Sequence, residues 1–446
     1  MKITILLTAV VYLAAANPLQ NVSTLHCTGE CQQGAKAPLM NRVMRLKLKE
    51  HEECVKEHQC PTVAPALSDT PCVSGRAGEY ECSNVDLLSF VPLKDMGCNG
   101  DGNDIWGWTD SDTKKEYAIV GCQDGTSFVD ITEPTKPVVM GFMKTQTVSS
   151  LWRDIKVFKD HAFVVSEARN HGMQVYDLTE LRNLIPGQIY ELTPTVYYSE
   201  MGNTHNIVAN EETGFMYAVG TSTCRGGLHM IDVKDPKDPK FVGCFAGDGY
   251  VHDAQCVIYK GPDEKYTGME ICFCYNEDTL TIVDVTNKNE PKQLATKPYA
   301  GSQYTHQGWL NEEQSHLLMN DELDEMYGSR KNTRSMIWNV KDLANPTLVD
   351  SFYSEKEAVD HNLYIRGKLA YESNYSAGLR ILNIETITNT DPKLEEVGFF
   401  DVSPEHNGVT FNGAWSAYVY FESQSIIVSS IERGLFVLKY TGPEAM

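Results

Sequence analysis

A unit of about fifty residues that recurs along the chain constrains the fold more than any other feature. From about residue 103 onward, each unit opens with a pair of polar residues and runs into an alternating apolar strand, followed by three further strand patterns separated by turns. The third strands are the most alike, as in "GTSFVDITEPTKPVVMGFM" and "GGLHMIDVKDPKDPKFVGCF", where β-branched residues precede Asp- and Pro-marked turns. Four short strands per unit and almost no helical pattern predict an all-β chain folded as a β-propeller.

The opening polar pairs set the number of blades. They are Asn103-Asp104, Arg153-Asp154, His205-Asn206, His252-Asp253, His306-Gln307, His361-Asn362 and His406-Asn407. Seven pairs predict seven blades. The last unit ends at "GLFVLKY" without a fourth strand, whereas "NVDLLSFVPL", residues 84–93, looks like the tail of a third strand and a fourth strand without their beginning. We expect this N-terminal strand to complete the last blade, which would leave no exposed sheet edge there.

The N-terminus predicts export. Residues 1–16 place one lysine before an apolar run that ends in small residues, the pattern of a secretory signal peptide. No later stretch approaches the roughly 18 apolar residues of a membrane span. Residues 17–81 then form a small cysteine-rich module in which "APLMNRVMRLKLKEHEECVKEHQC" predicts an amphipathic helix. The propeller is expected to span residues 82–441.

Cysteine usage agrees with an oxidising compartment. Six of the 13 cysteines lie in the first ninety residues: Cys27, Cys31, Cys54, Cys60, Cys72 and Cys82. We interpret them as a disulfide framework that stabilises the small module, with a zinc cluster as a less favoured alternative for the first four. The odd total leaves at least one thiol unpaired or intermolecular. Asn21 and Asn374 begin sequons for N-glycosylation.

The formal net charge of −22 excludes some partners and favours others. A surface this acidic repels nucleic acid and anionic lipid headgroups. It attracts calcium, cationic partners or a mineral face, although such a charge also serves solubility alone. The run Asp321, Glu322, Asp324 and Glu325 at the end of a strand is the candidate calcium site, with a solvated acidic loop as the alternative.

The polar pairs have two interpretations. Equivalent residues at the start of each innermost strand face one another around the channel of a propeller. Five imidazoles in such a ring suit zinc, copper or nickel. However, one pair in every blade is also what a structural device would look like, each side chain bonding the neighbouring blade. Catalysis normally breaks such symmetry, so the structural interpretation is favoured. Similarly, Trp106, Trp108, Trp152 and Trp309 either pack between blades or line a ligand pocket.

Four stretches resemble a known family: "CVSGRAGEYECSNVDLLSFVPL", "NDIWGWTD", "EYAIVGCQDGTSFVDITEPTKP" and "YTHQGWLNEEQSHLLMNDELDE". They are similar to the choice-of-anchor B proteins, which are secreted or surface-anchored propellers related to the LVIVD-repeat group. The resemblance covers roughly residues 72–440. It implies an extracellular propeller with Cys72 and Cys82 bonded to each other, and it implies no reaction. The cysteine-rich N-terminal module departs from the family pattern.

The sequence thus leads to two functional hypotheses. The first is a secreted, non-enzymatic propeller that binds extracellular matrix or cationic and mineral partners, with calcium support, such as an acidic component of a shell or skeletal matrix. The alternative is a metal-dependent hydrolase at the channel mouth, by analogy with propeller lactonases. The ligands in that case would be Asp104, Asp154, Asn206, Asp253, Asn362 and Asn407. No nucleophile elbow, zinc-protease motif or phosphate-binding loop supports an enzyme of another kind.

Overall fold

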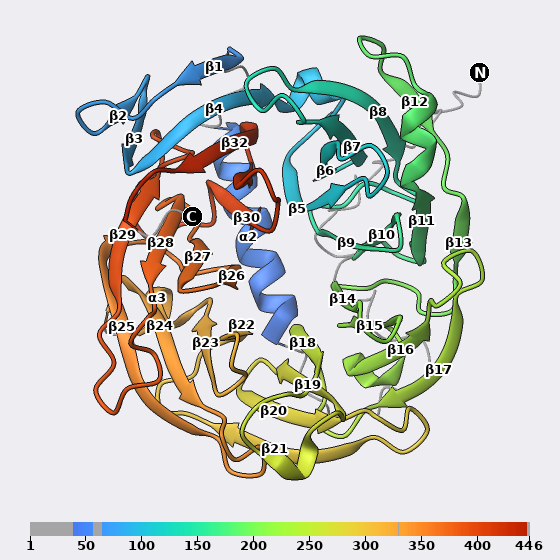
Figure 1. Cartoon of the computed structure of the whole chain (residues 1–446), viewed down its shortest axis with the longest axis vertical. Coiled ribbons are helices and arrows are strands. Elements are labelled where there is room, and N and C mark those ends of the chain that lie inside the picture. Colours follow the sequence, from blue (N-terminus) through green and yellow to red (C-terminus); the bar gives the residue numbers. More distant parts are fainter. Residues whose placement is uncertain (1–38, 57–64, 329, 444–446) are drawn as a thin grey trace, which may run out of the picture. The chain divides into compact units, whose positions relative to one another are not determined.

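The computed structural model describes residues 39–56, 65–328 and 330–443. Seven antiparallel blades surround a central channel, as the repeat predicts (Figure 1). In each blade the strand that follows the opening polar residues is innermost, and the later strands lie progressively further from the axis. The seven-bladed propeller is therefore confirmed.

The first four blades follow the chain in order. The first contains β5 (Gly102–Thr109), β6 (Glu116–Cys122), β7 (Gly125–Asp130) and β8 (Val138–Lys144), with β12 (Tyr190–Leu192) added in parallel; the second contains β9 (Arg153–Phe158), β10 (His161–Ser166), β11 (Met173–Asp177) and β13 (Val196–Tyr198). The third contains β14 (Asn206–Asn210), β15 (Phe215–Val219), β16 (Leu228–Asp232) and β17 (Lys240–Phe245); the fourth contains β18 (Asp253–Ile258), β19 (Glu270–Tyr275), β20 (Thr279–Asp284) and β21 (Lys292–Pro298).

The last three blades complete the ring. The fifth contains β22 (Thr305–Leu310), β23 (His316–Asp321), β24 (Asn332–Asn339) and β25 (Thr347–Glu357); the sixth contains β26 (Leu363–Arg366), β27 (Leu369–Ser373), β28 (Leu379–Asn383) and β29 (Glu395–Phe400), extended by β3 (Tyr80–Ser83) and β2 (Arg76–Ala77). The seventh contains β30 (Ala414–Tyr418), β31 (Ser425–Ser430) and β32 (Gly434–Tyr440), then β4 (Val85–Pro92) and β1 (Leu67–Thr70). Short helices are α3 (Asp324–Tyr327), η1 (Leu93–Met96), η2 (Leu178–Asn183), η3 (Cys224–Gly226) and η4 (Glu264–Tyr266).

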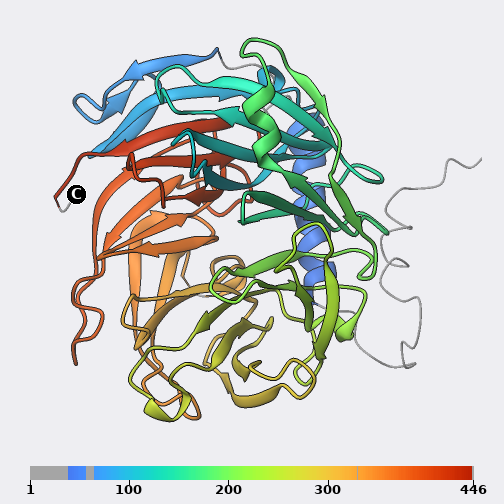
Figure 2. The same ribbon diagram turned by 45° about the vertical axis from the view of Figure 1, so that its right-hand side comes forward.

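The N-terminal strand closes the seventh blade, as expected. Strand β4 pairs antiparallel with β32 along its whole length (Figure 2). Phe90 lies opposite Phe436, with ring centroids 4.6 Å apart. Both rings are buried and pack against Tyr80. The first and last strands of the propeller therefore share one hydrophobic core, which stabilises the ring at the point where the chain ends meet.

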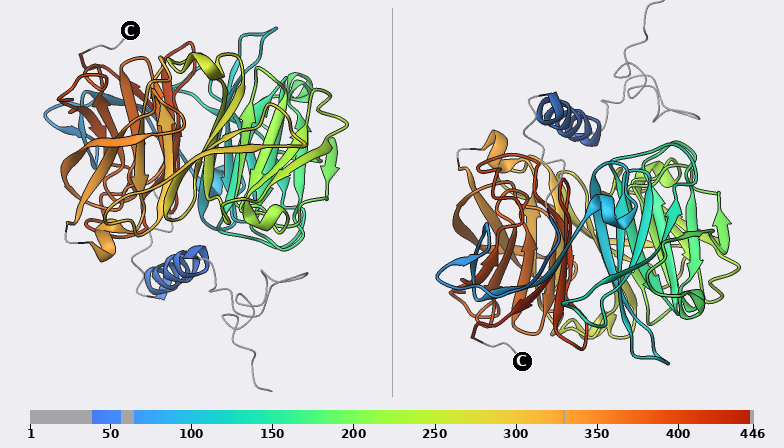
Figure 3. Two further views of the ribbon diagram at one scale, coloured as in Figure 1. Left: turned by 90° about the horizontal axis from the view of Figure 1, so that it is seen from below. Right: turned by 90° about the horizontal axis from the view of Figure 1, so that it is seen from above.

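The segment before the propeller contributes a helix and two strand additions. The predicted amphipathic helix is α2 (Leu39–Lys56). Four of its buried residues, Met40, Val43, Met44 and Lys47, lie at the spacing of one helical face. This face packs against the start of the innermost strands at one mouth of the channel (Figure 3). Strands β1 and β3 pair with the propeller strands β4 and β29, and β2 pairs with β3, so the boundary predicted near residue 81 falls inside β3. The predicted signal peptide, Asn21, Cys27, Cys31 and Cys60 lie outside the described residues.

Disulfides link neighbouring segments of the propeller. The bond between Cys72 and Cys82, which the family resemblance implies, is present. The others within the described chain are Cys98–Cys122, Cys224–Cys244 and Cys256–Cys272, and Cys54 is disulfide-bonded as well. Cys274 is a free thiol; it is fully buried, and burial raises its pKa. Its inaccessibility makes it a core residue.

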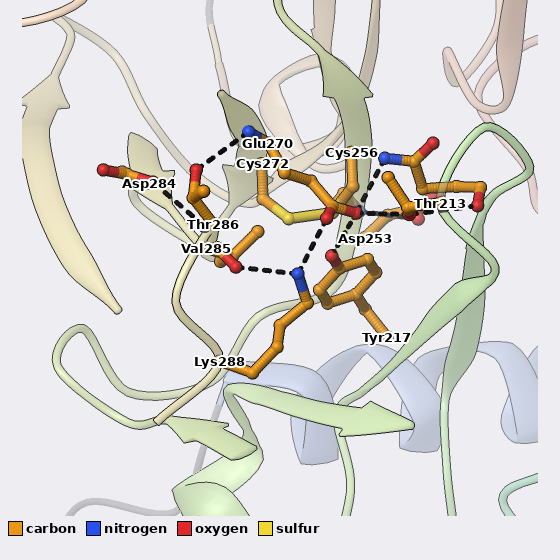
Figure 4. The surroundings of a disulfide bond; sticks show 12 residues. Thr213, Tyr217, Asp253, Cys256, Glu270, Cys272, Asp284, Val285, Thr286 and Lys288 are labelled. Carbon is orange, nitrogen blue, oxygen red and sulfur yellow. Dashed lines mark hydrogen bonds and ion pairs between the residues drawn. A yellow bond between two sulfur atoms is a disulfide. The ribbon is translucent and has the colours of Figure 1, made fainter. Parts of the chain in front are cut away.

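The Cys256–Cys272 bond joins β18 to β19 beside a buried acid, Glu270 (Figure 4). The Glu270 carboxylate accepts hydrogen bonds from Tyr217 Oη at 2.5 Å and Thr213 Oγ1 at 2.9 Å, and lies 2.7 Å from Lys288 Nζ. Its partners come from the third and fourth blades, so a satisfied polar network links these blades.

Candidate functional site

The polar pairs form two stacked rings around the channel. We call the first residues the entry ring: Asn103, Arg153, His205, His252, His306, His361 and Trp415. The residues that follow them form the bridge ring: Asp104, Asp154, Asn206, Asp253, Gln307, Asn362 and Ser416. In β5, β22 and β30 a β-bulge at these positions inserts an extra residue, which re-aims the side chains.

The seventh pair predicted from the sequence is wrong. His406 and Asn407 lie in the loop between β29 and β30, where His406 contacts Ser403 Oγ at 2.8 Å and Cys54 Sγ at 3.9 Å. The equivalent position is Trp415: its carbonyl oxygen lies 2.6 Å from His361 Nδ1, 54 residues earlier in the chain. The His306 carbonyl is met by His252 Nδ1 in the same way, also 54 residues apart. The entry ring therefore holds four imidazoles instead of five.

The bridge ring connects successive blades. Asp104 Oδ2 accepts the Ile155 N–H at 3.0 Å, Asp154 Oδ2 accepts the Ile207 N–H at 2.6 Å, and Gln307 Oε1 accepts the Leu363 N–H at 2.6 Å. In each case a side chain of one blade satisfies a backbone donor of the next. These are the blade-to-blade bonds expected of a structural device, and they account for the acid or amide at this position.

The four imidazoles of the entry ring follow one another in close contact, each ring tilted against the next. Ring centroids lie 4.3 Å apart for His205 and His252, 4.1 Å for His252 and His306, and 4.5 Å for His306 and His361. Burial lowers the pKa of His252, His306 and His361 well below the usual value, so all three are neutral at physiological pH. Arg153 and Asn103 instead turn aside, bonding the Cys122 and Leu151 carbonyl oxygens.

Helix α2 places a lysine among these imidazoles. Lys47 Nζ lies 2.5 Å from Glu322 Oε1, and both side chains are buried. Glu322 also accepts the Tyr375 hydroxyl at 2.6 Å and lies 3.6 Å from His361 Nε2. The ammonium group faces the rings of Tyr375, Phe411 and Trp415 at 5.3 to 5.4 Å. This ion pair is the polar centre of the contact between α2 and the propeller.

The acidic run divides between three places instead of forming one site. Asp321 accepts the backbone N–H groups of Gln303 at 2.8 Å and Tyr304 at 2.7 Å, and Glu322 points to Lys47. Asp324 and Glu325 belong to α3 and meet Asp360, with oxygens of the three carboxyl groups within 4.8 Å of one another. The run was expected to follow a strand and to gather alternate carboxylates at its end. Strand β23 does end at Asp321, but the chain turns there and sends the carboxylates to different partners.

The sequon at Asn374 is not an accessible glycosylation site. Asn374 is 1% exposed, its side-chain amide donates to Glu372 at 3.0 Å, and its oxygen accepts the His361 N–H at 3.1 Å. It therefore supports the entry ring from within the core, and a glycan at this position would disrupt that support.

Three residues beyond the entry ring, a third ring lines a cavity of about 390 Å³ in the channel. We call it the pocket ring: Trp106, Lys156, Val208, Gln255, Trp309, Tyr364 and Tyr418. Strand alternation explains it, because positions two apart share a face and these residues follow the bridge ring by two. Tyr420, Glu211 and Asp253 complete the wall. Trp106 and Trp309, two of the four tryptophans noted in the sequence, thus line this cavity.

The cavity wall combines aromatic faces with charge. Tyr364 contacts Trp106 and Trp309 edge-on, with centroids 5.6 and 4.9 Å apart. Lys156 Nζ lies 2.9 Å from Asp154, 3.9 Å from Asp104 and 4.5 Å from the Trp106 ring centroid. Burial lowers the pKa of the Lys156 ammonium, but the neighbouring carboxylates outweigh it and raise the pKa overall. The lysine therefore stays charged and compensates the acids beneath the cavity.

The buried carboxyl group of Asp253 lowers the stability of the folded protein by an amount that depends on pH. Burial, and then the charge of Asp154, raise its pKa to about 7. A carboxyl whose pKa rises on folding costs nothing below about pH 4, costs progressively more up to its folded pKa, and has a constant cost above it. We expect Asp253→Asn to stabilise the protein by about 4 kcal/mol at pH 8 and by nothing near pH 4. Unfolding of both proteins across this pH range measures the difference, and an equal effect at both ends would contradict the assignment.

No protein-family model matches the sequence, and no curated protein matches it either. Solved structures that are similar include a functionally unknown protein from Desulfotomaculum acetoxidans (13% identity, TM-score 0.48, 70% of this chain and 88% of that one) and a protein from Lactobacillus plantarum (11%, 0.49, 77% and 98%). Another is a periplasmic gluconolactonase from Pseudomonas aeruginosa (12%, 0.44, 66% and 87%). These values are too low to bear on function. None of the described helices is long and apolar enough to cross a membrane.

Proposed function

We propose that this protein is a secreted binding protein of the choice-of-anchor B type, and that its channel cavity takes the cationic group of a small ligand. The main observation in support of this proposal is the cavity of about 390 Å³, whose walls include two tryptophans and three tyrosines. Aromatic faces attract cations, most strongly where water is excluded. Glu211 and Asp253 add acidic groups to the wall, and the chain carries a net charge of −22. Such a field concentrates cations near the mouth.

Choline and its neutral isostere 3,3-dimethyl-1-butanol separate the cationic interpretation from simple apolar binding. We expect choline to quench tryptophan fluorescence with a Kd at least tenfold lower than that of the alcohol, because only choline carries the charge that the rings attract. Tyr420→Ala, on the cavity wall, should weaken choline binding about tenfold, since it removes one aromatic face. Tyr353→Ala, on an exposed part of β25, is the matched control. Equal binding of both probes would contradict the proposal.

The supporting calcium site of this proposal is the group Asp324, Glu325 and Asp360. Burial, and then the neighbouring acids, raise the pKa of all three carboxyls. Neither oxygen of the Glu325 carboxyl group, which is 1% exposed, has a hydrogen-bond partner within the described residues. Arg334 Nη1, at 3.6 Å from Asp324, compensates part of the charge. A hard cation with oxygen ligands would compensate the rest.

Calcium is expected to stabilise the fold through this group. At a calcium concentration 100 times its Kd, the gain is about 2.7 kcal/mol, seen as a rise in Tm relative to protein in EGTA. Asp360→Asn should remove most of that rise, because it deletes a ligand charge. Asp350→Asn, on the exposed strand β25 of the same blade, should keep it. A Tm that does not respond to calcium in the unaltered protein would refute the site.

A further inference from the structure

Glu322 is a fully buried carboxylate at the channel mouth, and its cation comes from outside the propeller. Its side chain is 0% exposed, and Lys47 Nζ of α2 lies 2.5 Å from its Oε1. The propeller itself offers two imidazoles, with His306 Nε2 at 3.9 Å and His361 Nε2 at 3.6 Å. Lys47 Nζ is closer to the carboxylate than either imidazole, so the positive charge beside Glu322 comes from α2.

The tautomer of His361 favours a cation or a proton donor between this imidazole and the Glu322 carboxylate. Its Nδ1 lies 2.6 Å from the Trp415 carbonyl oxygen, which can only accept, so Nδ1 carries the proton. The Nε2 lone pair therefore faces the Glu322 carboxylate. Two acceptors face each other favourably only when a cation or a proton donor lies between them. A carbonyl that fixes the far nitrogen in this way is a frequent feature of histidines that bind metals.

The distances suit a transition metal. Ligand atoms of His306, Glu322 and His361 all lie within 4.8 Å of one another. A tetrahedral zinc ion with ligands at about 2.1 Å separates neighbouring ligand atoms by about 3.4 Å. His361 Nε2 lies 3.6 Å from Glu322 Oε1 and His306 Nε2 lies 3.9 Å from Glu322 Oε2, which is about 0.2 and 0.5 Å longer than that value. Glu322 Oε2 and His306 Nδ1 are buried without a hydrogen-bond partner in the described structure.

We propose that His306, Glu322 and His361 form a divalent metal site of the zinc type, and that Lys47 of α2 occupies the position of the ion. Metal binding and docking of α2 then exclude one another, because the ammonium group and the ion compete for the same carboxylate. Docking also covers this mouth of the channel, so the helix masks both the ligands and the entrance. This site is independent of the channel cavity and of the calcium group.

Cobalt and zinc titration of the whole protein tests the proposal. Lys47→Ala should bind one Co²⁺ per chain at least tenfold more tightly than the unaltered protein, with the intense visible absorption of a tetrahedral site, because the competing cation is gone. Lys49→Ala is the matched control, since Lys49 lies on the same helix and is 70% exposed. In the Lys47→Ala background, His361→Ala should abolish binding. His161→Ala, on β10 away from the channel, should leave it intact.

Two results would overturn the proposal. One is Co²⁺ binding by Lys47→Ala that is no tighter than that of Lys49→Ala, which would make Lys47 a structural ion-pair partner only. The other is binding that survives His361→Ala. If Lys47→Ala does not fold, hydrogen exchange of the unaltered protein decides instead. Excess Zn²⁺ should speed the exchange of α2 amides while β20 stays protected, and unchanged α2 exchange would refute the competition.

Discussion

Lys156→Met is expected to destabilise the propeller by about 3–5 kcal/mol, which is the cost of leaving a buried charge without its partner. Lys156 lies 2.9 Å from Asp154 and 3.9 Å from Asp104, and both acids are buried. Both also accept backbone N–H groups of the next blade. Protonating them to avoid the uncompensated charge would weaken those blade-to-blade bonds. Chemical denaturation at pH 7.5 measures the loss.

Lys115→Met is the matched control for this prediction. Lys115 lies 3.0 Å from Asp130, but its side chain is 42% exposed. Ion pairs in contact with water contribute about 0–1 kcal/mol, so this variant should remain close to the unaltered protein. The Lys156→Met deficit should also shrink as the pH falls, because Asp104, whose pKa is raised by burial, then takes up a proton. A deficit equal to that of Lys115→Met would show that Lys156 does not compensate these acids.

Phe90→Ala should cost about 3–5 kcal/mol, the range for a large aromatic removed from a core. The ring is 1% exposed and lies between Phe436 and Tyr80, at centroid distances of 4.6 and 6.4 Å. Because β4 joins the N-terminal end of the propeller to its last strand, the lost packing of Phe90 weakens the closure of the ring. We expect hydrogen exchange in β32 to accelerate more than exchange in β20, which lies in the fourth blade.

Phe241→Ala serves as the comparison for the closing strand. Phe241 is on β17, the outermost strand of the third blade, and is 46% exposed. The same chemical change there should alter stability by no more than about 0.5 kcal/mol. If Phe90→Ala loosened β20 as much as β32, the seventh blade would not be the weakest point of the ring, and closure by β4 would not limit its stability.

The seven-bladed fold could be predicted from the sequence because its structural unit is repeated. Strand alternation, turn residues and the polar pairs all recur with one period, so each unit supports the interpretation of the others. The predicted seventh pair, His406-Asn407, was wrong because it was chosen by residue type. Spacing alone would have favoured Trp415, at 54 residues from His361. Blade seven places a bulky aromatic at this position and so departs from the pattern of the other units.

The residues that line the cavity could have been predicted from the sequence, but the contact between α2 and the propeller could not. Once the pairs are placed, counting three residues onward in each blade gives the pocket ring, including Trp106, Lys156 and Tyr418. Helix α2 was predictable from its periodicity, yet an amphipathic face does not say what it covers. Its one signal was Lys47, a charged residue that falls on the same face as Met40, Val43 and Met44. Only the three-dimensional structure shows Glu322 opposite it.

Closure by β4 has a consequence for biosynthesis. The strand is made before the first complete blade, whereas its partner β32 is made only after all the other blade strands. At about 5–20 residues per second, the roughly 345 residues between them take on the order of 20–70 s. Throughout that interval β4 has no permanent neighbour, and an unpaired strand edge is prone to wrong association. The polypeptide must therefore be kept from premature pairing until β32 has been made, so chains truncated before β32 cannot close the ring and are expected to aggregate.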